Sequence, residues 1–370
     1  MKTPAIVYYI SGHGFGHATR SVEVINRLRA VRPEVPIHIR SWASKQIFDE
    51  MCPGVPVANG QFDIGVVQAD GISMDIEATL KRCTEILDQA DSKVDDELAW
   101  LKTLPAGCIV SDIPPIAHTV ASKMGIPCLT VTNFTWDWIY DGWSQTYPHV
   151  QPLVNRMFDQ YALSDCLLRL PYAGDLPAFR CVKDMPMLGR KAELDAATTR
   201  QRLGLDAESR LLVLLSFGGM GFQSGSLDGL SALDDYCLLT TFPVEHPSVH
   251  HLPPLLQKGV SYPDLVKAVD VVVTKPGYGI VSECAVNHTR MVYTDRGPFR
   301  EYDMILEEFP YWNCAEYVER SRLRRGDFRD ALDNVMTRDP ADVPGAAEAA
   351  RANGAAAVAN EVLAYYDRGR

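Results

Sequence analysis

The sequence predicts an α/β protein with two domains, each built on a parallel sheet. Apolar runs such as residues 5–10 and 271–273 are continuous rather than alternating, which is typical of strands buried on both faces of a parallel sheet. Helical patterns separate these runs along the whole chain, as the α/β class requires. At 370 residues the chain is too long for one typical domain.

The domain boundaries follow from a change in pattern near the middle of the chain. Residues 171–190 are rich in proline and show little periodicity, so we expect them to connect an N-terminal domain, 1–170, to a C-terminal domain, 191–340. The alanine-rich segment 341–370 should form a terminal helix, which can cross back to the N-terminal domain.

Composition excludes several classes of protein. A formal charge of −11, from 36 basic and 47 acidic residues, argues against a general nucleic-acid or anionic-membrane binder. The nine cysteines include no C-x-x-C pair, which predicts reduced thiols in a cytoplasmic protein rather than a disulfide framework or a zinc site. No apolar stretch approaches the length of a membrane span, and the first apolar run is too short for a secretory signal.

The first strand, 5–10, leads into a glycine loop with the sequence SGHGFGHATR, residues 11–20, and then into a helical pattern. A glycine loop between a strand and a helix is typical of a nucleotide-binding fold, but the third glycine of the dinucleotide fingerprint is replaced by His17. The next strand, 37–41, ends without a ribose-binding acid. Its Arg40 leaves NADP binding open as an alternative.

Residues 75–104 carry apolar side chains at steps of three and four, which predicts one long amphipathic helix. The strand that follows ends at Asp112, and another strand covers 129–132. Because the carboxyl ends of parallel strands meet at one edge of a sheet, we expect loop 11–20 and Asp112 to lie close together. The aromatic stretch 133–143 can stack on a flat ligand or cover the core.

The second half repeats the alternation of strands and helices. The expected strands are 211–217, 236–241, 249–252, 271–273 and 291–294.

The most informative stretch of the second half is DVVVTKPGYGIVSE, residues 270–283. A buried strand, a glycine turn and a helix start follow one another here. Glycines let the backbone approach a ligand, and the free amides and the dipole of the helix favour phosphate. Glu283, further along the helix, can accept hydrogen bonds from a sugar's hydroxyls. The alternative is an ordinary strand–helix turn whose glycines only permit tight packing.

Taken together, these motifs resemble the GT-B glycosyltransferases, which have two Rossmann-like domains with parallel sheets facing across a cleft. The first glycine loop, SFGG at 216–219 and PGYGIVSE at 276–283 occur in the order and spacing of that fold. The inverting, metal-independent branches are the most similar: the UDP-glycosyltransferases and the family 28-like N-acetylglucosaminyltransferases. GHGFGHATR, TNFTWDWIY and KPGYGIVSE also resemble the glycosyltransferase-like N-terminal half of the arabinokinases. The resemblance covers nearly the whole chain.

The resemblance implies a nucleotide-sugar donor, most commonly a UDP-sugar, bound by the C-terminal domain, with no other cofactor. Its diphosphate would lie on the glycine turn and its ribose on Glu283. Glu301, in the segment 295–303 past the next strand, would contact the sugar. The residues expected to bind the donor are Gly14, Gly16, Gly218, Gly219, Lys275, Gly277, Tyr278, Gly279, Ser282, Glu283 and Glu301. The chain has no D-x-D motif, so no bridging metal is expected.

The resemblance also implies a catalytic base. His17 stands where the UDP-glycosyltransferases have the histidine that takes the proton of the acceptor hydroxyl, and Asp112 would orient its imidazole. His13 is the rival for the base. A helix-capping or phosphate-contacting role is the alternative for His17.

Three functions remain open at this point. The first is an inverting, metal-independent transferase of a hexosyl or N-acetylhexosaminyl group to an acceptor hydroxyl. The second is a UDP-sugar 2-epimerase-like enzyme of the same fold. The third is a non-catalytic module that binds a nucleotide-sugar. The identity of the acceptor, of the donor sugar and of its base is not predicted.

Overall fold

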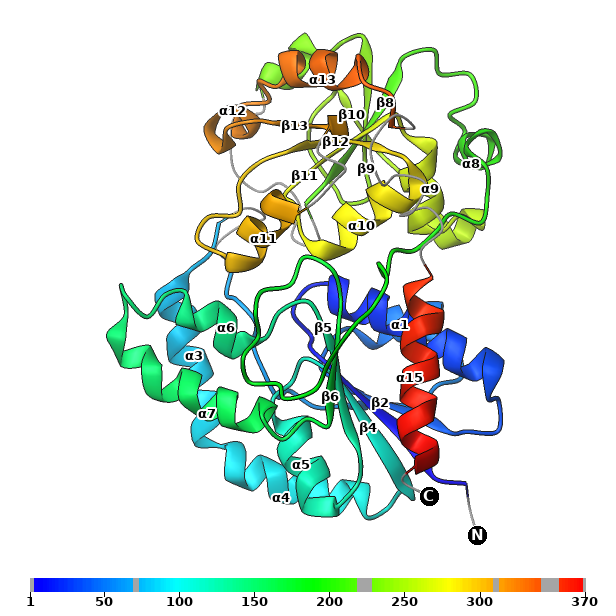
Figure 1. Cartoon of the computed structure of the whole chain (residues 1–370). Coiled ribbons are helices and arrows are strands. Elements are labelled where there is room, and N and C mark those ends of the chain that lie inside the picture. The colour runs from blue at the N-terminus through cyan, green and yellow to red at the C-terminus, as the bar shows by residue number, and fades with distance from the viewer. Residues whose placement is uncertain (1–2, 69–72, 218–227, 309–312, 341–352, 369–370) are drawn as a thin grey trace.

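Two parallel sheets, one above the other in Figure 1, form the framework of the molecule. The computed structural model describes residues 3–68, 73–217, 228–308, 313–340 and 353–368. The first sheet has seven strands in the order β3-β2-β1-β4-β5-β6-β7, and the second has six in the order β10-β9-β8-β11-β12-β13. Every strand pair in both sheets is parallel, which confirms the predicted α/β class.

Nine of the strands fall close to the predicted apolar runs, and the short strands β3, β6, β7 and β13 are added. The strands are β1 (Ala5–Ile10), β2 (Ile37–Ser41), β3 (Val57–Asn59), β4 (Ala106–Asp112), β5 (Cys128–Thr132), β6 (Cys166–Arg169), β7 (Val182–Asp184), β8 (Leu211–Ser216), β9 (Tyr236–Thr240), β10 (Val249–His251), β11 (Val271–Thr274), β12 (Arg290–Tyr293) and β13 (Ala315–Tyr317).

Helices cover both faces of each sheet (Figure 1). They are α1 (Gly16–Val31), α2 (Lys45–Met51), α3 (Ile76–Asp88), α4 (Ala90–Leu101), α5 (Ile116–Met124), α6 (Trp136–Asp141), α7 (Gln151–Tyr161), α8 (Ala196–Leu203), α9 (Tyr262–Ala268), α10 (Tyr278–Asn287), α11 (Arg300–Glu308), α12 (Arg320–Arg324), α13 (Arg329–Met336) and α15 (Gly354–Arg368).

The register of the sheets brings the predicted motifs to the strand ends. In the first sheet, Ile10 at the end of β1 pairs with Asp112 at the end of β4. The backbone amide of Ser11 then donates to the carbonyl of Asp112 at 2.7 Å, so the glycine loop starts beside that residue. In the second sheet, Thr274 at the end of β11 pairs with Ser216 at the end of β8. Both glycine turns therefore leave the carboxyl edge of their sheet.

The single long helix predicted for residues 75–104 is wrong. The structure divides it into α3 and α4 at Gln89, whose φ of −92° and ψ of 2° are not helical. The apolar side chains on either side of the break pack in different cores. Leu80 and Leu87 pack in a cluster with the aromatic stretch that follows β5. Val94 and Leu101 pack in another cluster, against residues of β1 and β4. The chain turns at Gln89 because one straight helix cannot serve both clusters.

The prediction that all nine cysteines are reduced is also wrong for two of them. Cys166 and Cys181 lie opposite each other where β6 meets β7, with Cα atoms 4.6 Å apart, and are joined by a disulfide. The other seven are free and buried. Sequence separation gave no signal for this pair, because only the pairing of β6 with β7 brings the two residues together.

Two segments that follow the first half in the sequence pack against it. Strand β7 lies within the predicted connecting segment and pairs with β6 in the first sheet. Helix α15 packs along α1 of the first half, as Figure 1 shows, and its Val358 and Val362 enter the same core as Val22. The expected start of the terminal helix, at 341, lies outside the described residues.

One core cluster continues across the two halves of the molecule. Val22 and Ile25 of α1 and Val281 and Ala285 of α10 belong to it. Because α1 and α10 pack together, the turns at which these helices begin face each other. None of the helices in the described parts of the chain is long and apolar enough to cross a membrane.

Candidate active site

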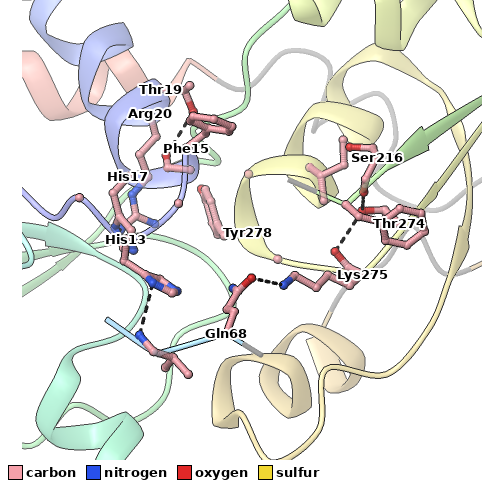
Figure 2. A pocket seen from close by; sticks show the side chains of 18 of the residues that line it. His13, Phe15, His17, Thr19, Arg20, Gln68, Ser216, Thr274, Lys275 and Tyr278 are labelled. Atoms are coloured by element: carbon pink, nitrogen blue, oxygen red, sulfur yellow. Dashed lines mark hydrogen bonds between the residues drawn. The ribbon is translucent and has the colours of Figure 1, made fainter. Parts of the chain in front are cut away.

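A cavity of about 860 Å³ lies between the two halves. Its lining comes from the loop that precedes α1 and from the turn that precedes α10, and Figure 2 shows the side chains that project into it. Of the residues predicted to form the site, those on the cavity wall are Gly14, Gly16, His17, Lys275, Gly277, Tyr278, Gly279, Glu283 and Glu301.

The first glycine loop ends where α1 begins, at Gly16. Gly14 has a φ of 65°, a backbone conformation that favours glycine, and a Cβ there would contact nothing within 4 Å. Phe15 at the helix N-cap makes no side-chain cap, so the first amides of α1 are not satisfied in that way. Gly16 itself faces α10: a Cβ on Gly279 would lie 3.7 Å from the Cα of Gly16.

His17 and Asp112 meet beside this loop. The Nδ1 atom of His17 lies 2.9 Å from Oδ1 of Asp112. The same carboxylate accepts hydrogen bonds from Arg20 Nε at 2.7 Å and from Ser21 Oγ at 2.9 Å. Asp112 is 1% exposed and His17 is 6% exposed.

The charge state of Asp112 determines the tautomer of His17. Burial alone would raise the pKa of Asp112, but the Arg20 guanidinium and the His17 ring outweigh it and hold that pKa well below its ordinary value. Asp112 is therefore a carboxylate that only accepts. Arg20 Nη2 also lies 3.1 Å from Nδ1, but this donor has Asp112 Oδ1 and Thr132 Oγ1 as its own acceptors. The Nδ1 of a neutral His17 therefore carries the proton and donates to Asp112. This leaves the lone pair of His17 on Nε2.

The ring of His13 carries its proton on the other nitrogen. Its Nδ1 accepts a hydrogen bond from the backbone amide of Val66 at 3.3 Å. Burial, with the nearby charges of His17, Arg296 and Lys275, lowers its pKa well below the ordinary value, so the ring is neutral. A neutral ring that accepts at Nδ1 carries its proton on Nε2. His13 can donate to a ligand from Nε2 but cannot take a proton there.

The second glycine turn leads into α10. Gly277 is the N-cap, with no side-chain cap, and the first helical hydrogen bond runs from the amide of Val281 to the carbonyl of Gly277 at 3.1 Å. The amides of residues 278–280 precede that bond and lie at the positive end of the helix dipole. The phenol of Tyr278 points away to the connecting segment, where it accepts from the amide of Leu188 at 2.9 Å.

Glu283 lies on the same helix and is buried against Arg190. The Arg190 guanidinium donates to its Oε1. Burial raises the pKa of Glu283, and Arg190 opposes that shift. Ser282, by contrast, does not face the cavity, because its hydroxyl donates to the carbonyl of Gly279 at 2.9 Å.

Two further predicted residues are engaged by protein groups. The Oε1 of Glu301 accepts from Asn133 Nδ2 at 2.9 Å, and its Oε2 accepts from Arg296 at 2.5 Å. Lys275 donates to Gln68 Oε1 at 3.2 Å, which links the α10 turn to the first half of the chain (Figure 2).

Other expectations fall elsewhere. Gly218 and Gly219 lie outside the described residues. The expected strand 249–252 forms as β10 but does not line the cavity, which is bounded at that end by Thr241, Phe242 and Tyr262. Arg40 is bound to Glu97 and lies over the ring of Trp100, away from the cavity, so the structure gives NADP no support. Among the described residues, no group of three or more His, Cys, Asp or Glu side chains is placed to hold a metal ion.

The aromatic stretch after β5 mostly covers the core. Trp136, Trp138 and Trp143 are buried, and only Phe134 of this stretch lines the cavity. Trp136 donates from Nε1 to the buried carboxylate of Asp63 at 3.0 Å.

Sequence reasoning missed Asn133 and Arg190. Asn133 directly follows β5, at the sheet edge that carries Asp112, so its position was a usable signal. Arg190 closes the connecting segment, and only the folded chain brings it to Glu283. Arg20, the last residue of the first glycine loop, forms an ion pair with Asp112 of the same half.

Comparison with known proteins agrees with this geometry. Residues 4–137 match the family model described as glycosyl transferase family 1. The chain is 32% identical over 348 residues to L-arabinokinase from Arabidopsis thaliana, and the match covers 92% of this chain. It spans only 33% of that relative's length.

Solved structures share the architecture over nearly the full chain. The glycotransferase of kitacinnamycin has a TM-score of 0.65 at 16% identity, covering 99% of this chain and 100% of that one. A UDP-glucosyltransferase from Polygonum tinctorium has a TM-score of 0.66 at 11% identity, covering 99% of each chain. The chain therefore has the two-domain GT-B fold of the glycosyltransferases, and its N-terminal part matches glycosyl transferase family 1.

Proposed function

We propose that this protein is an inverting, metal-independent glycosyltransferase that moves a sugar from a UDP-sugar to an acceptor hydroxyl. The observation that carries the proposal is one cavity that joins two complementary parts. One wall presents the free Nε2 of His17, and the other presents the amide-rich start of α10. A base and an anion site facing one space are the groups that glycosyl transfer requires.

In the proposed step, His17 Nε2 takes the proton of the acceptor hydroxyl. The acceptor oxygen forms a bond to the anomeric carbon while the bond from that carbon to the diphosphate oxygen breaks. The bonding electrons leave with UDP, and attack from the opposite face inverts the anomeric centre. The Asp112 carboxylate, already bonded to Nδ1–H, stabilises the imidazolium that forms.

The donor would lie along the second half. The backbone of Gly277 and Gly279 and the amides at the start of α10 would neutralise the leaving diphosphate, with Lys275 adding positive charge. Glu283 would accept from the ribose hydroxyls while Arg190 holds its carboxylate. The structural neighbour named as a UDP-glucosyltransferase supports UDP as the nucleotide.

Turnover of the donor tests the proposal. The protein should slowly release UDP from a UDP-sugar without an acceptor, and NMR should show a sugar of inverted anomeric configuration. A product of retained configuration would contradict the mechanism. Conversion of the UDP-sugar into a UDP-linked epimer would favour the epimerase-like activity instead.

The second candidate is a nucleotide-sugar-binding module without catalysis. The match to one third of L-arabinokinase favours it, because the name of that protein describes a kinase and not a sugar transferase. Such a module would bind UDP and never turn over the donor, whatever acceptor is added.

A further inference from the structure

The side chain of Arg20 connects Asp112 to Asn133, at the edge of the first half that faces the second half. Its Nε contacts Asp112 Oδ2 at 2.7 Å, and its Nη1 donates to Asn133 Oδ1 at 2.8 Å. Arg20 is 5% exposed and Asn133 is fully buried. Its Nη2 also donates to Thr132 Oγ1 at 3.1 Å, so the cation serves three acceptor residues at the ends of two adjacent strands, β4 and β5.

Asn133 also contacts a residue of the second half of the molecule. Its Nδ2 donates to Glu301 Oε1 at 2.9 Å. A guanidinium only donates and a carboxylate only accepts, so the Asn133 amide can satisfy both neighbours in only one orientation. An asparagine suits this position because it presents an acceptor to Arg20 and a donor to Glu301.

Glu301 extends this series of contacts to the turn that precedes α10, where the sugar donor is proposed to bind. Its Oε1 lies 3.4 Å from the amide of Tyr278, the first residue of α10, and its other oxygen is ion-paired with Arg296. Through these contacts Glu301 helps to fix the turn. It also lines the cavity, so the sequence expectation that it contacts the sugar stays a prediction.

We propose that Asn133 and Glu301 are positioning residues that hold the α10 turn in register with the His17–Asp112 pair. This inference rests on the proposed function, because the turn is taken as the donor site. A buried chain of charged and polar groups is favourable only while every member is satisfied, so loss of one contact disturbs both ends. In this series of contacts, the hydrogen bond between Asn133 and Glu301 is the one that joins the two halves of the molecule.

A pair of matched substitutions isolates the contact. Asn133→Asp keeps the shape but places a carboxylate against Glu301, and it removes the donor. Glu301→Gln keeps an amide oxygen that can accept from both Asn133 and the Tyr278 amide, and it loses only the ion pair with Arg296. The double variant, N133D with E301Q, replaces two facing carboxylates by one acceptor and one donor, with Arg20 still bound by the new carboxylate. The amide nitrogen introduced at position 301 then faces the Tyr278 amide, so the contact with the α10 turn is not restored.

Calorimetric titration with UDP is the readout, with thermal unfolding as the check that each variant is folded. Asn133→Asp should weaken UDP binding by about ten-fold, and Glu301→Gln should weaken it less because both contacts of Oε1 can be kept. The double variant should recover part of the loss of Asn133→Asp, because the facing carboxylates are removed while the Tyr278 amide stays without its acceptor. Asp141→Asn is the control. Asp141 contacts Arg300 across the same interface but takes no part in the series of contacts from Arg20 to Tyr278. Its UDP affinity should equal that of the wild type.

The outcomes separate the two proposals. If the wild type does not bind UDP, the proposed function fails. If the wild type binds UDP but Asn133→Asp binds it equally well, the positioning role is overturned. A double variant that binds UDP no better than Asn133→Asp also overturns it, since the loss would then reflect general damage to the core.

Discussion

His17 and Asp112 are 95 residues apart in the chain, yet Nδ1 of one lies 2.9 Å from Oδ1 of the other. The pairing of β1 with β4 produces this contact, because it places the ends of the two strands side by side. The contact fixes the tautomer of the histidine, and the first two predictions below depend on it.

Replacing His17 by glutamine should remove the base while keeping a polar side chain. We expect donor turnover to fall by about 10² to 10⁴-fold, the usual contribution of a general base, with UDP affinity nearly unchanged. His13→Gln is the matched control, because its Nε2 carries a proton and cannot serve as the base. Steady-state kinetics with a UDP-sugar would decide, and a greater loss in the His13 variant would reverse the assignment.

Replacing Asp112 by asparagine should affect both activity and stability. The amide can no longer hold His17 with the Nδ1 proton, so turnover should fall by about 10²-fold or more. Arg20 would lose its buried counter-ion, which should cost about 3–5 kcal/mol in the free energy of unfolding. Urea denaturation and kinetics on the same sample measure the two effects. Unchanged stability would show that Arg20 does not depend on this carboxylate.

Gly14 and Gly16 offer a matched pair of alanine substitutions. A Cβ at either position meets nothing within 4 Å, but only Gly14 has a positive φ, of 65°. Gly14→Ala should therefore lower the free energy of unfolding by about 1–2 kcal/mol, the cost of the left-handed conformation for an alanine. Gly16→Ala should be close to neutral. Equal losses in urea denaturation would mean that backbone strain is not the cause.

Asp137 should make stability depend on pH. It is buried, its Oδ1 has no hydrogen-bond partner among the described residues, and desolvation raises its pKa to about 6. Because the folded pKa exceeds the unfolded value, the group is best tolerated when protonated, and stability falls as the pH rises from about 4 to 6.

The variant Asp137→Asn tests this directly. It should be more stable than the wild type at pH 8 by about 1–3 kcal/mol, and the difference should shrink toward pH 4. Asp141→Asn, in the same helix but partly exposed, serves as the control. A stability difference that does not change with pH would exclude titration of Asp137 as the cause.

Much of the fold could be predicted from local pattern. Continuous apolar runs identified the central strands, and the alternation with helices identified the class. The short strands β3, β6, β7 and β13 were missed because three or four residues carry too little periodicity. The break at Gln89 was missed because an apolar repeat does not reveal that its two halves pack in different cores.

The candidate site was predictable only where a residue adjoins a strand end. His17 and Asp112 met this condition, and topology then placed them together. Arg190 did not, since its approach to Glu283 depends on how the connecting segment crosses the second half. Side-chain pairing across the interface, as between Asn133 and Glu301, has no signature in a single sequence.

The central claim is that the α10 turn and Glu283 form the binding site of a nucleotide diphosphate. Calorimetric titration with UDP, dTDP, GDP and ADP tests it most directly, on the wild type, on Glu283→Gln and on the exposed control Glu193→Gln. The account predicts that the wild type and the control bind UDP, and that Glu283→Gln weakens this binding by about ten-fold through the ribose contact. If no nucleotide binds the wild type at millimolar concentration, the claim is contradicted.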